Sequence, residues 1–136
     1  MHAHIKEAWL QALRSGEYRQ GQHALYWGEK YCCLGVLCDL HSKQTGTSWE
    51  EAPGCRFEHT YMSASGLLPP EVVEWAGLDE GSRVLVKVGY RTHFDIALPI
   101  PQFGKSEARV SELNDDGKSF KEIADLVEEY ITSNND

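Results

Sequence analysis

The chain has 136 residues, of which 41% are apolar and 10% aromatic, and its formal net charge is −8. This length fits one domain, residues 1–136, around one hydrophobic core, and the composition excludes an intrinsically disordered chain. No apolar run reaches the roughly 20 residues of a membrane span, and the N-terminus lacks the basic-then-apolar order of a signal peptide. We therefore expect a cytoplasmic protein without a membrane partner. Its negative charge argues against direct, sequence-specific nucleic-acid binding, which depends on cations that contact phosphates.

The first predicted elements are a helix and a hairpin. Apolar residues at helical spacing predict an amphipathic helix over residues 3–15, with Gly16 as its stop. Two β-prone runs, 24–27 and 30–33, flank the dipeptide Gly28–Glu29. A two-residue turn that contains glycine between such runs predicts a β-hairpin.

The next stretch is apolar nearly all round. Residues 33–41 predict a buried helix, because the following residues, up to Gly46, are typical of a helix C-terminus. Residues 43–55, rich in Gly, Ser and Thr, predict a loop, and residues 56–62 predict a strand.

The second half predicts a short helix, a hairpin and a final helix. Prolines at the start and an early acid place the short helix at residues 68–77. Alternating apolar residues predict a second, half-buried hairpin with strands 84–88 and 93–98. Ser119 and Glu122 form a capping box before an amphipathic helix that extends to Ile131. The predicted fold is α+β, a small antiparallel sheet packed with the N-terminal and C-terminal helices. We expect five residues in its core: Trp9, Leu37, Phe120, Ile123 and Val127.

The four cysteines are predicted to be free, reduced thiols. Cys32 and Cys33 are adjacent, which is poor geometry for a disulfide, Cys38 lies in an apolar run, and Cys55 lies in a polar stretch. Paired zinc ligands at C-x-x-C or H-x-x-x-H spacing do not occur. Residues 111–117 resemble a calcium loop, but the pattern then puts an isoleucine where it needs glutamate. We predict neither a metal nor a cofactor.

The sequence also lacks a recognisable catalytic motif. A cysteine–histidine dyad would need an electropositive, partly exposed thiol, whereas the apolar neighbours of Cys32 and Cys33 predict burial. No spacing singles out two of the 21 acidic residues, and there is no glycine-rich phosphate loop. We predict no catalytic residues, and the sequence favours no reaction class.

The residues that favour binding lie in two segments. After the first helix come Arg14, Tyr18, Arg19 and Gln20, and arginine and tyrosine are common in binding hot spots. Asn114 and Asp115 precede the last helix in a turn whose polar groups exceed what capping requires. The alternative is a capped helix followed by a solvated loop. If the arginines lead, the ligand is a small anion or an acidic protein patch; a basic partner would use the acidic residues 115–129 instead.

Three segments carry a resemblance to a family of small proteins encoded by bacteriophages and prophages. They are residues 9–20 (WLQALRSGEYRQ), 31–40 (YCCLGVLCDL) and 113–125 (LNDDGKSFKEIAD). Residues 43–110 carry no such match. The resemblance implies a phage origin and a host-cell cytoplasm.

By analogy, the resemblance favours a non-catalytic binding protein that acts on a host protein or sequesters a host signal molecule, as counter-defence proteins do. Two alternatives stay open. One is a small hydrolase of a nucleotide-type substrate, and the other is a structural or regulatory phage component. The sequence leaves a homo-oligomer open as well.

Overall fold

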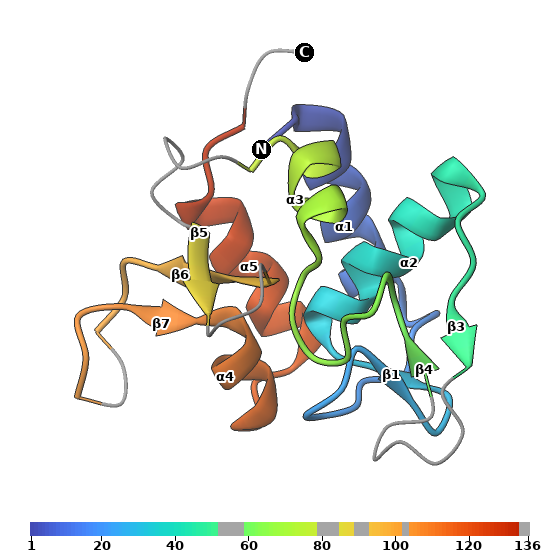
Figure 1. Cartoon of the computed structure of the whole chain (residues 1–136). Helices are drawn as coiled ribbons and strands as arrows, with labels where there is room; N and C mark the ends of the chain where they lie inside the picture. Colours follow the sequence, from blue (N-terminus) through green and yellow to red (C-terminus); the bar gives the residue numbers. More distant parts are fainter. Residues whose placement is uncertain (52–58, 79–84, 89–92, 102–103, 134–136) are drawn as a thin grey trace.

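The computed structural model describes residues 1–51, 59–78, 85–88, 93–101 and 104–133. A cluster of buried apolar side chains joins residues from Met1 to Ile131 into one core, so the prediction of a compact α+β domain is confirmed. Figure 1 shows the helices in the middle of the molecule, with the sheet of β5, β6 and β7 on one side and the small hairpins around β1 and β4 on the other. The elements are α1 (Ala3–Ser15), β1 (Tyr26–Trp27), β2 (Lys30–Tyr31), α2 (Cys33–Thr45), β3 (Glu50–Glu51), β4 (His59–Thr60), α3 (Pro70–Ala76), β5 (Leu85–Val88), β6 (His93–Leu98), β7 (Ala108–Arg109), α4 (Val110–Asp115) and α5 (Phe120–Tyr130).

Helix α1 has the predicted bounds and ends at Gly16, whose φ of 79° is left-handed. Trp9 is fully buried, and its Nε1 donates to the carbonyl oxygen of Cys33 at 3.0 Å. This bond ties the middle of α1 to the first residue of α2. At the start of the chain, the amine of Met1 donates to the carbonyl oxygen of Thr132 at 3.3 Å, so the described ends of the chain meet.

The first hairpin forms around the predicted turn. Gly28 and Glu29 both have positive φ, 61° and 63°, as the tight turns that match the twist of two strands require. Trp27 pairs with Lys30, and Tyr26 pairs with Tyr31. Each strand has two residues, half of the predicted length. Residues 24 and 25 precede the first strand without pairing in the hairpin, and Cys33 already belongs to α2.

Helix α2 is buried on almost every side, as its apolar composition predicts. It continues one turn past the predicted end and stops at Gly46, whose φ of 80° is left-handed and whose N–H donates to the carbonyl oxygen of Ser42 at 2.9 Å. Gly35 lies against the backbone before β1: an ideal Cβ here would be 1.8 Å from the carbonyl oxygen of Leu25. Only glycine allows the hairpin and α2 to approach this closely.

The predicted loop over 43–55 contains one short strand. Glu50 and Glu51 pair with Thr60 and His59, so the loop prediction is wrong for these two residues, whose low β propensity gives no sign of a strand. It is also wrong for residues 43–45, which form the end of α2. Of the predicted strand over 56–62, β4 is the part that the structure confirms. Tyr61 and Ala64 exchange two backbone hydrogen bonds of 2.8 Å across a turn, which ends the strand. Residues 52–58, including Cys55, lie outside the described residues.

The second predicted hairpin is confirmed as β5 and β6, in a register that pairs Val88 with His93. Val84 and the turn between the strands lie outside the described residues. The predicted half-burial is wrong for the end of β6, where residues 95–98 are buried on both faces. Asp95 is 1% exposed where α4 packs against β6, and Ser111 of α4 donates to its carboxylate from both Oγ and the backbone. The sheet is therefore covered on the side where water was expected.

The C-terminal part holds two helices where one was predicted. Helix α4, six residues long, occupies what the sequence indicated as a turn. Helix α5 begins with the predicted capping box: Glu122 N donates to Ser119 Oγ at 3.1 Å, and Ser119 N donates to Glu122 Oε1 at 3.2 Å. The short helix α3 also lies within its predicted range. The predicted core residues are all buried: Trp9, Leu37, Phe120, Ile123 and Val127.

Candidate functional site

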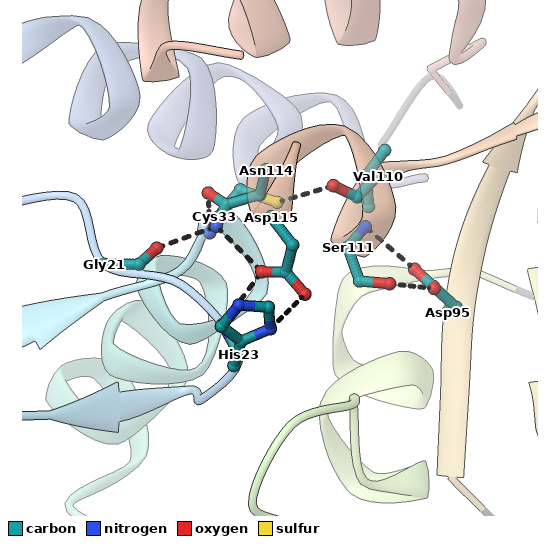
Figure 2. Close-up of polar contacts among 8 residues, drawn as sticks. All are labelled: Gly21, His23, Cys33, Asp95, Val110, Ser111, Asn114 and Asp115. Carbon is teal, nitrogen blue, oxygen red and sulfur yellow. Dashed lines mark hydrogen bonds and ion pairs between the residues drawn. The ribbon is translucent and has the colours of Figure 1, made fainter. Parts of the chain in front are cut away.

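The two segments predicted to bind a partner meet in space around Asn114, the fifth residue of α4. Asn114 is fully buried, and its amide connects two other parts of the chain, the loop after α1 and the start of α2. Its Oδ1 accepts from Cys33 N at 3.2 Å, and its Nδ2 donates to the carbonyl oxygen of Gly21 at 2.8 Å (Figure 2). The same Oδ1 accepts from Gln20 Nε2 at 2.9 Å. The bond to Cys33 satisfies one of the N–H groups that the first turn of α2 leaves without a helical partner. Asn114 thus fixes the loop after α1 against both helices.

Gln20 extends this connection to α5. Its Nε2 donates to the carbonyl oxygen of Lys118 at 2.7 Å, and its Oε1 accepts from Phe120 N at 3.0 Å. The backbone of the neighbouring residues joins β2, since Tyr31 N donates to the carbonyl oxygen of Arg19 and Gly21 N donates to that of Tyr31, both at 2.8 Å. The amides of Gln20 and Asn114 are therefore occupied by the protein itself, and they shape the site rather than offer free donors.

Asp115 holds the next part of the same loop. Its Oδ1 accepts from His23 N at 2.8 Å, and its Oδ2 lies 3.3 Å from His23 Nδ1, a pair that is ionic when the imidazole is protonated (Figure 2). His23 has a φ of 69°, an uncommon conformation for a residue with a side chain. Two contacts from one carboxylate stabilise this conformation, so the loop is held in place before any ligand binds.

A pocket with a volume of about 430 Å³ lies between this loop, the first hairpin and the end of α4. Two of its lining residues, Gly21 and Lys30, lie close together, because a Cβ added at Gly21 would be 2.7 Å from the Cβ of Lys30. The volume falls within the range of small-molecule sites. The described residues that line it are Gln20, Gly21, Gln22, His23, Ala24, Trp27, Lys30, Asn114 and Gly117.

The charge of this lining differs from that of the whole protein. Among the described residues that line the pocket, Lys30 and His23 are basic and none is acidic, in a chain with a net charge of −8. The side chain of His23 is 65% exposed, although its Nδ1 lies next to Asp115. The pocket can therefore offer an ammonium group and an imidazole to a negatively charged ligand.

The other predicted residues lie elsewhere or are engaged elsewhere. Arg14 donates at 2.8 Å to both Asp125 and Glu128 of α5, and these hydrogen bonds raise the pKa of its guanidinium. Tyr18 donates at 2.6 Å to the buried carboxylate of Asp39, and burial raises the pKa of the phenol. The side chain of Arg19 is exposed. A role of these three residues in binding stays a prediction, while Gln20 and Asn114 line the pocket and Asp115 supports it.

Seven of the nine described lining residues lie outside the predicted site, and four of these carry a polar or aromatic side chain: Gln22, His23, Trp27 and Lys30. Trp27 was assigned only to a strand, and the local pattern contains no sign that it stays exposed. The predicted turn at Gly28–Glu29 does imply one thing about these residues. Trp27 and Lys30 flank the turn, so they pair across the strands and share a face of the hairpin.

The cysteines do not form a reactive centre in the described part of the chain. Cys32, Cys33 and Cys38 are free and buried. Burial raises the pKa of Cys32 to about 12 and that of Cys33 and Cys38 well above the usual value, which keeps these thiols protonated. Within the described residues, no three His, Cys, Asp or Glu side chains gather where they could hold a metal ion.

The fold and the site thus define a small α+β domain with a preformed pocket. The chain belongs to a family described as a domain of unknown function, DUF8296, whose model matches residues 1–131. No curated protein and no solved structure matches the chain. None of the helices in the described residues has the length and apolar composition that crossing a membrane requires.

Proposed function

We propose that this chain is a non-catalytic binding protein that holds a small anionic ligand in the pocket beside the first hairpin. The observation that carries the proposal is the lining, which contains a lysine and a histidine and, among its described residues, no acid. The negative net charge of the protein disfavours anion binding in general, so the local excess of basic residues in this pocket calls for an explanation. An anionic ligand in the pocket would explain this excess.

The construction of the site also supports binding. Asn114, Gln20 and Asp115 fix the loop through hydrogen bonds to its backbone and side chains. A loop that is already ordered loses little conformational entropy when a ligand arrives, which leaves more of the interaction energy for affinity. The resemblance to phage proteins supports a setting in the host cytoplasm, where the ligand would be a host signal molecule that the protein sequesters.

Titration calorimetry with inorganic phosphate and pyrophosphate tests the proposal. We expect binding that weakens with added salt, and we expect Lys30→Gln to reduce the affinity at least about tenfold, since a charge-assisted contact is lost. Lys121→Gln is the matched control, because Lys121 is an exposed lysine on α5, outside the pocket. Equal affinities of the two variants and the original chain, or no binding at all, would contradict the proposal.

One observation favours a second function, a small hydrolase of a nucleotide-type substrate. The carboxylate of Asp115, which does not line the pocket, lies 3.3 Å from Nδ1 of the lining residue His23, the arrangement in which an acid orients an imidazole as a general base. Release of phosphate from nucleoside mono- and triphosphates distinguishes the two functions. Turnover that His23→Gln abolishes would establish the hydrolase, whereas binding without turnover is expected from the leading proposal.

A further inference from the structure

We infer that Gly21 is a positioning residue of this pocket, which sets the place of the Lys30 ammonium group because it has no side chain of its own. The inference rests on the proposed function, since Lys30 is the lysine of the proposed anion site. The role of Gly21 is indirect: it acts through Lys30 and offers the ligand no side chain.

The side chain of Lys30 occupies the space that a side chain at position 21 would need. A Cβ added at Gly21 would be 2.7 Å from the Cβ of Lys30 and 3.7 Å from its Cδ. The aliphatic stem of Lys30 therefore lies against Gly21. Rotation about the Cα–Cβ bond of Lys30 does not move its Cβ, so a change of rotamer cannot make room for a larger residue.

The backbone around Gly21 is fixed on both sides. Gly21 N donates to the carbonyl oxygen of Tyr31 at 2.8 Å, and the carbonyl oxygen of Gly21 accepts from Asn114 Nδ2 at 2.8 Å (Figure 2). Tyr31 N donates in turn to the carbonyl oxygen of Arg19 at 2.8 Å, so this loop lies beside β2. A side chain at position 21 would push the loop and Lys30 apart, and that shift would move the ammonium group relative to the rest of the lining.

The conformation of Gly21 does not itself require glycine. Its φ lies outside the left-handed region, whereas Gly117, another lining residue, has a φ of 103°. A Cβ added at Gly117 would meet no atom within 4 Å. Glycine is thus needed at position 117 for its backbone conformation and at position 21 for the close contact with Lys30.

The ammonium group of Lys30 depends on this contact for its orientation. Lys30 is exposed, and within the part of the chain that the structure describes its side chain takes part in no hydrogen bond or ion pair. Lys43, by comparison, is held by Asp39, with 3.2 Å between Nζ and Oδ2. Because no such partner restrains Lys30, the contact of its stem with Gly21 limits where the ammonium group can lie.

Calorimetry with inorganic phosphate tests the inference. Gly21→Ala should lower the affinity at least about tenfold, as Lys30→Gln does, and should weaken its salt dependence by the same amount, because both variants remove one cation from the site. Gly66→Ala is the matched control. Gly66 lies beside the same loop, also without a positive φ, but the nearest atom to an added Cβ is the carbonyl oxygen of His23 at 3.7 Å, an ordinary contact. This control should bind phosphate as the original chain does.

Two double variants separate positioning from a general loss of structure. Adding Gly21→Ala to Lys30→Gln should lower the affinity for pyrophosphate no further, because the charge through which Gly21 acts is already gone. A further tenfold loss would overturn the inference. Adding Lys30→Gly to Gly21→Ala removes the Cβ in the way and should raise the melting temperature that Gly21→Ala lowers, a check that needs no ligand; no such rise would contradict the contact.

The outcomes for the inference and for the proposed function are distinct. If Lys30→Gln weakens phosphate binding and Gly21→Ala does not, the inference is overturned and the proposed function stands. If Lys30→Gln leaves binding unchanged, or if the original chain does not bind, the proposed function fails and the inference falls with it.

Discussion

The side chain of Asn114, at the end of α4, accepts the backbone N–H of Cys33 at 3.2 Å and so caps the first turn of α2 across 81 residues of sequence. The same side chain donates to the carbonyl oxygen of Gly21, so the pocket loop and the central helix share one anchor. Stability and the shape of the pocket are therefore coupled through this residue.

We predict that Asn114→Ala lowers the free energy of unfolding by about 3 kcal/mol or more, because it leaves several buried donors and acceptors without partners, each at about 1–3 kcal/mol. Urea denaturation measures the change. Asp116→Ala, two residues further on and exposed, is the control and should change stability by less than about 0.5 kcal/mol. Similar values for the two variants would show that Asn114 does not anchor the loop.

A second prediction concerns the close contact at Gly35. Gly35→Ala should destabilise the fold by about 3 kcal/mol, since the new methyl group must displace the backbone at Leu25. Gly16→Ala is the comparison, because Gly16 has open space around it and only its positive φ opposes a side chain, at about 1–2 kcal/mol. Thermal or urea denaturation of both variants gives the order; a smaller effect at Gly35 than at Gly16 would contradict the packing described for α2.

Asp95 predicts a pH dependence of stability. Burial raises the pKa of its carboxyl above the usual value, although hydrogen bonds from Ser111 and Ile96 oppose the rise. A raised pKa in the folded state means that the folded protein holds the proton more tightly than the unfolded chain does. The contribution of Asp95 to stability is thus greatest below the usual pKa of about 3.9 and falls as the pH rises through the raised value.

Asp95→Asn removes this titration. Measured by urea denaturation from pH 4 to pH 7, the stability of the variant relative to the original chain should increase with pH. Glu112→Gln, on the same short helix as Ser111 but with less burial, is the control and should lack this trend. A difference between Asp95→Asn and the original chain that stays constant with pH would show that Asp95 keeps its ordinary pKa.

The thiols give a fourth prediction. Cys32, Cys33 and Cys38 are buried with raised pKa values, so they should resist alkylation by iodoacetamide at pH 8 in the folded protein. Mass spectrometry should find at most one modified cysteine before denaturation and four afterwards. Rapid modification of Cys32 or Cys33 in the folded protein would contradict their burial and strengthen the hydrolase alternative.

A fifth prediction separates the pocket from the originally predicted arginine site. If the ligand binds the pocket, Arg14→Ala combined with Arg19→Ala should leave phosphate affinity nearly unchanged, because Arg14 pairs with Asp125 and Glu128 instead. Calorimetry of the double variant, with its melting temperature as a control for folding, measures this. Loss of phosphate binding at an unchanged melting temperature would show that the ligand binds at Arg14 and Arg19 rather than in the pocket.

Local patterns were sufficient for part of this protein. The bounds of α1 and the capping box of α5 follow from residues within one or two helical turns, and the turn at Gly28 and Glu29 follows from two residues that accept positive φ. The burial of Trp9 and Ile123 follows from periodicity, and that of Leu37 follows from a run that is apolar on nearly every side. For these elements the physical determinants are adjacent in the chain, so the sequence alone contains them.

The pocket depends on contacts that adjacent residues do not make. Asn114 and Asp115 belong to a six-residue helix too short to show a periodic pattern, and their partners Gln20 and His23 lie about 90 residues away. The sequence selected Asn114 and Gln20 for an excess of polar groups, but only the tertiary structure turned those groups inward as anchors. It also gave the exposed face of the hairpin to Trp27 and Lys30, because Tyr26 and Tyr31 fill the other face against Trp49.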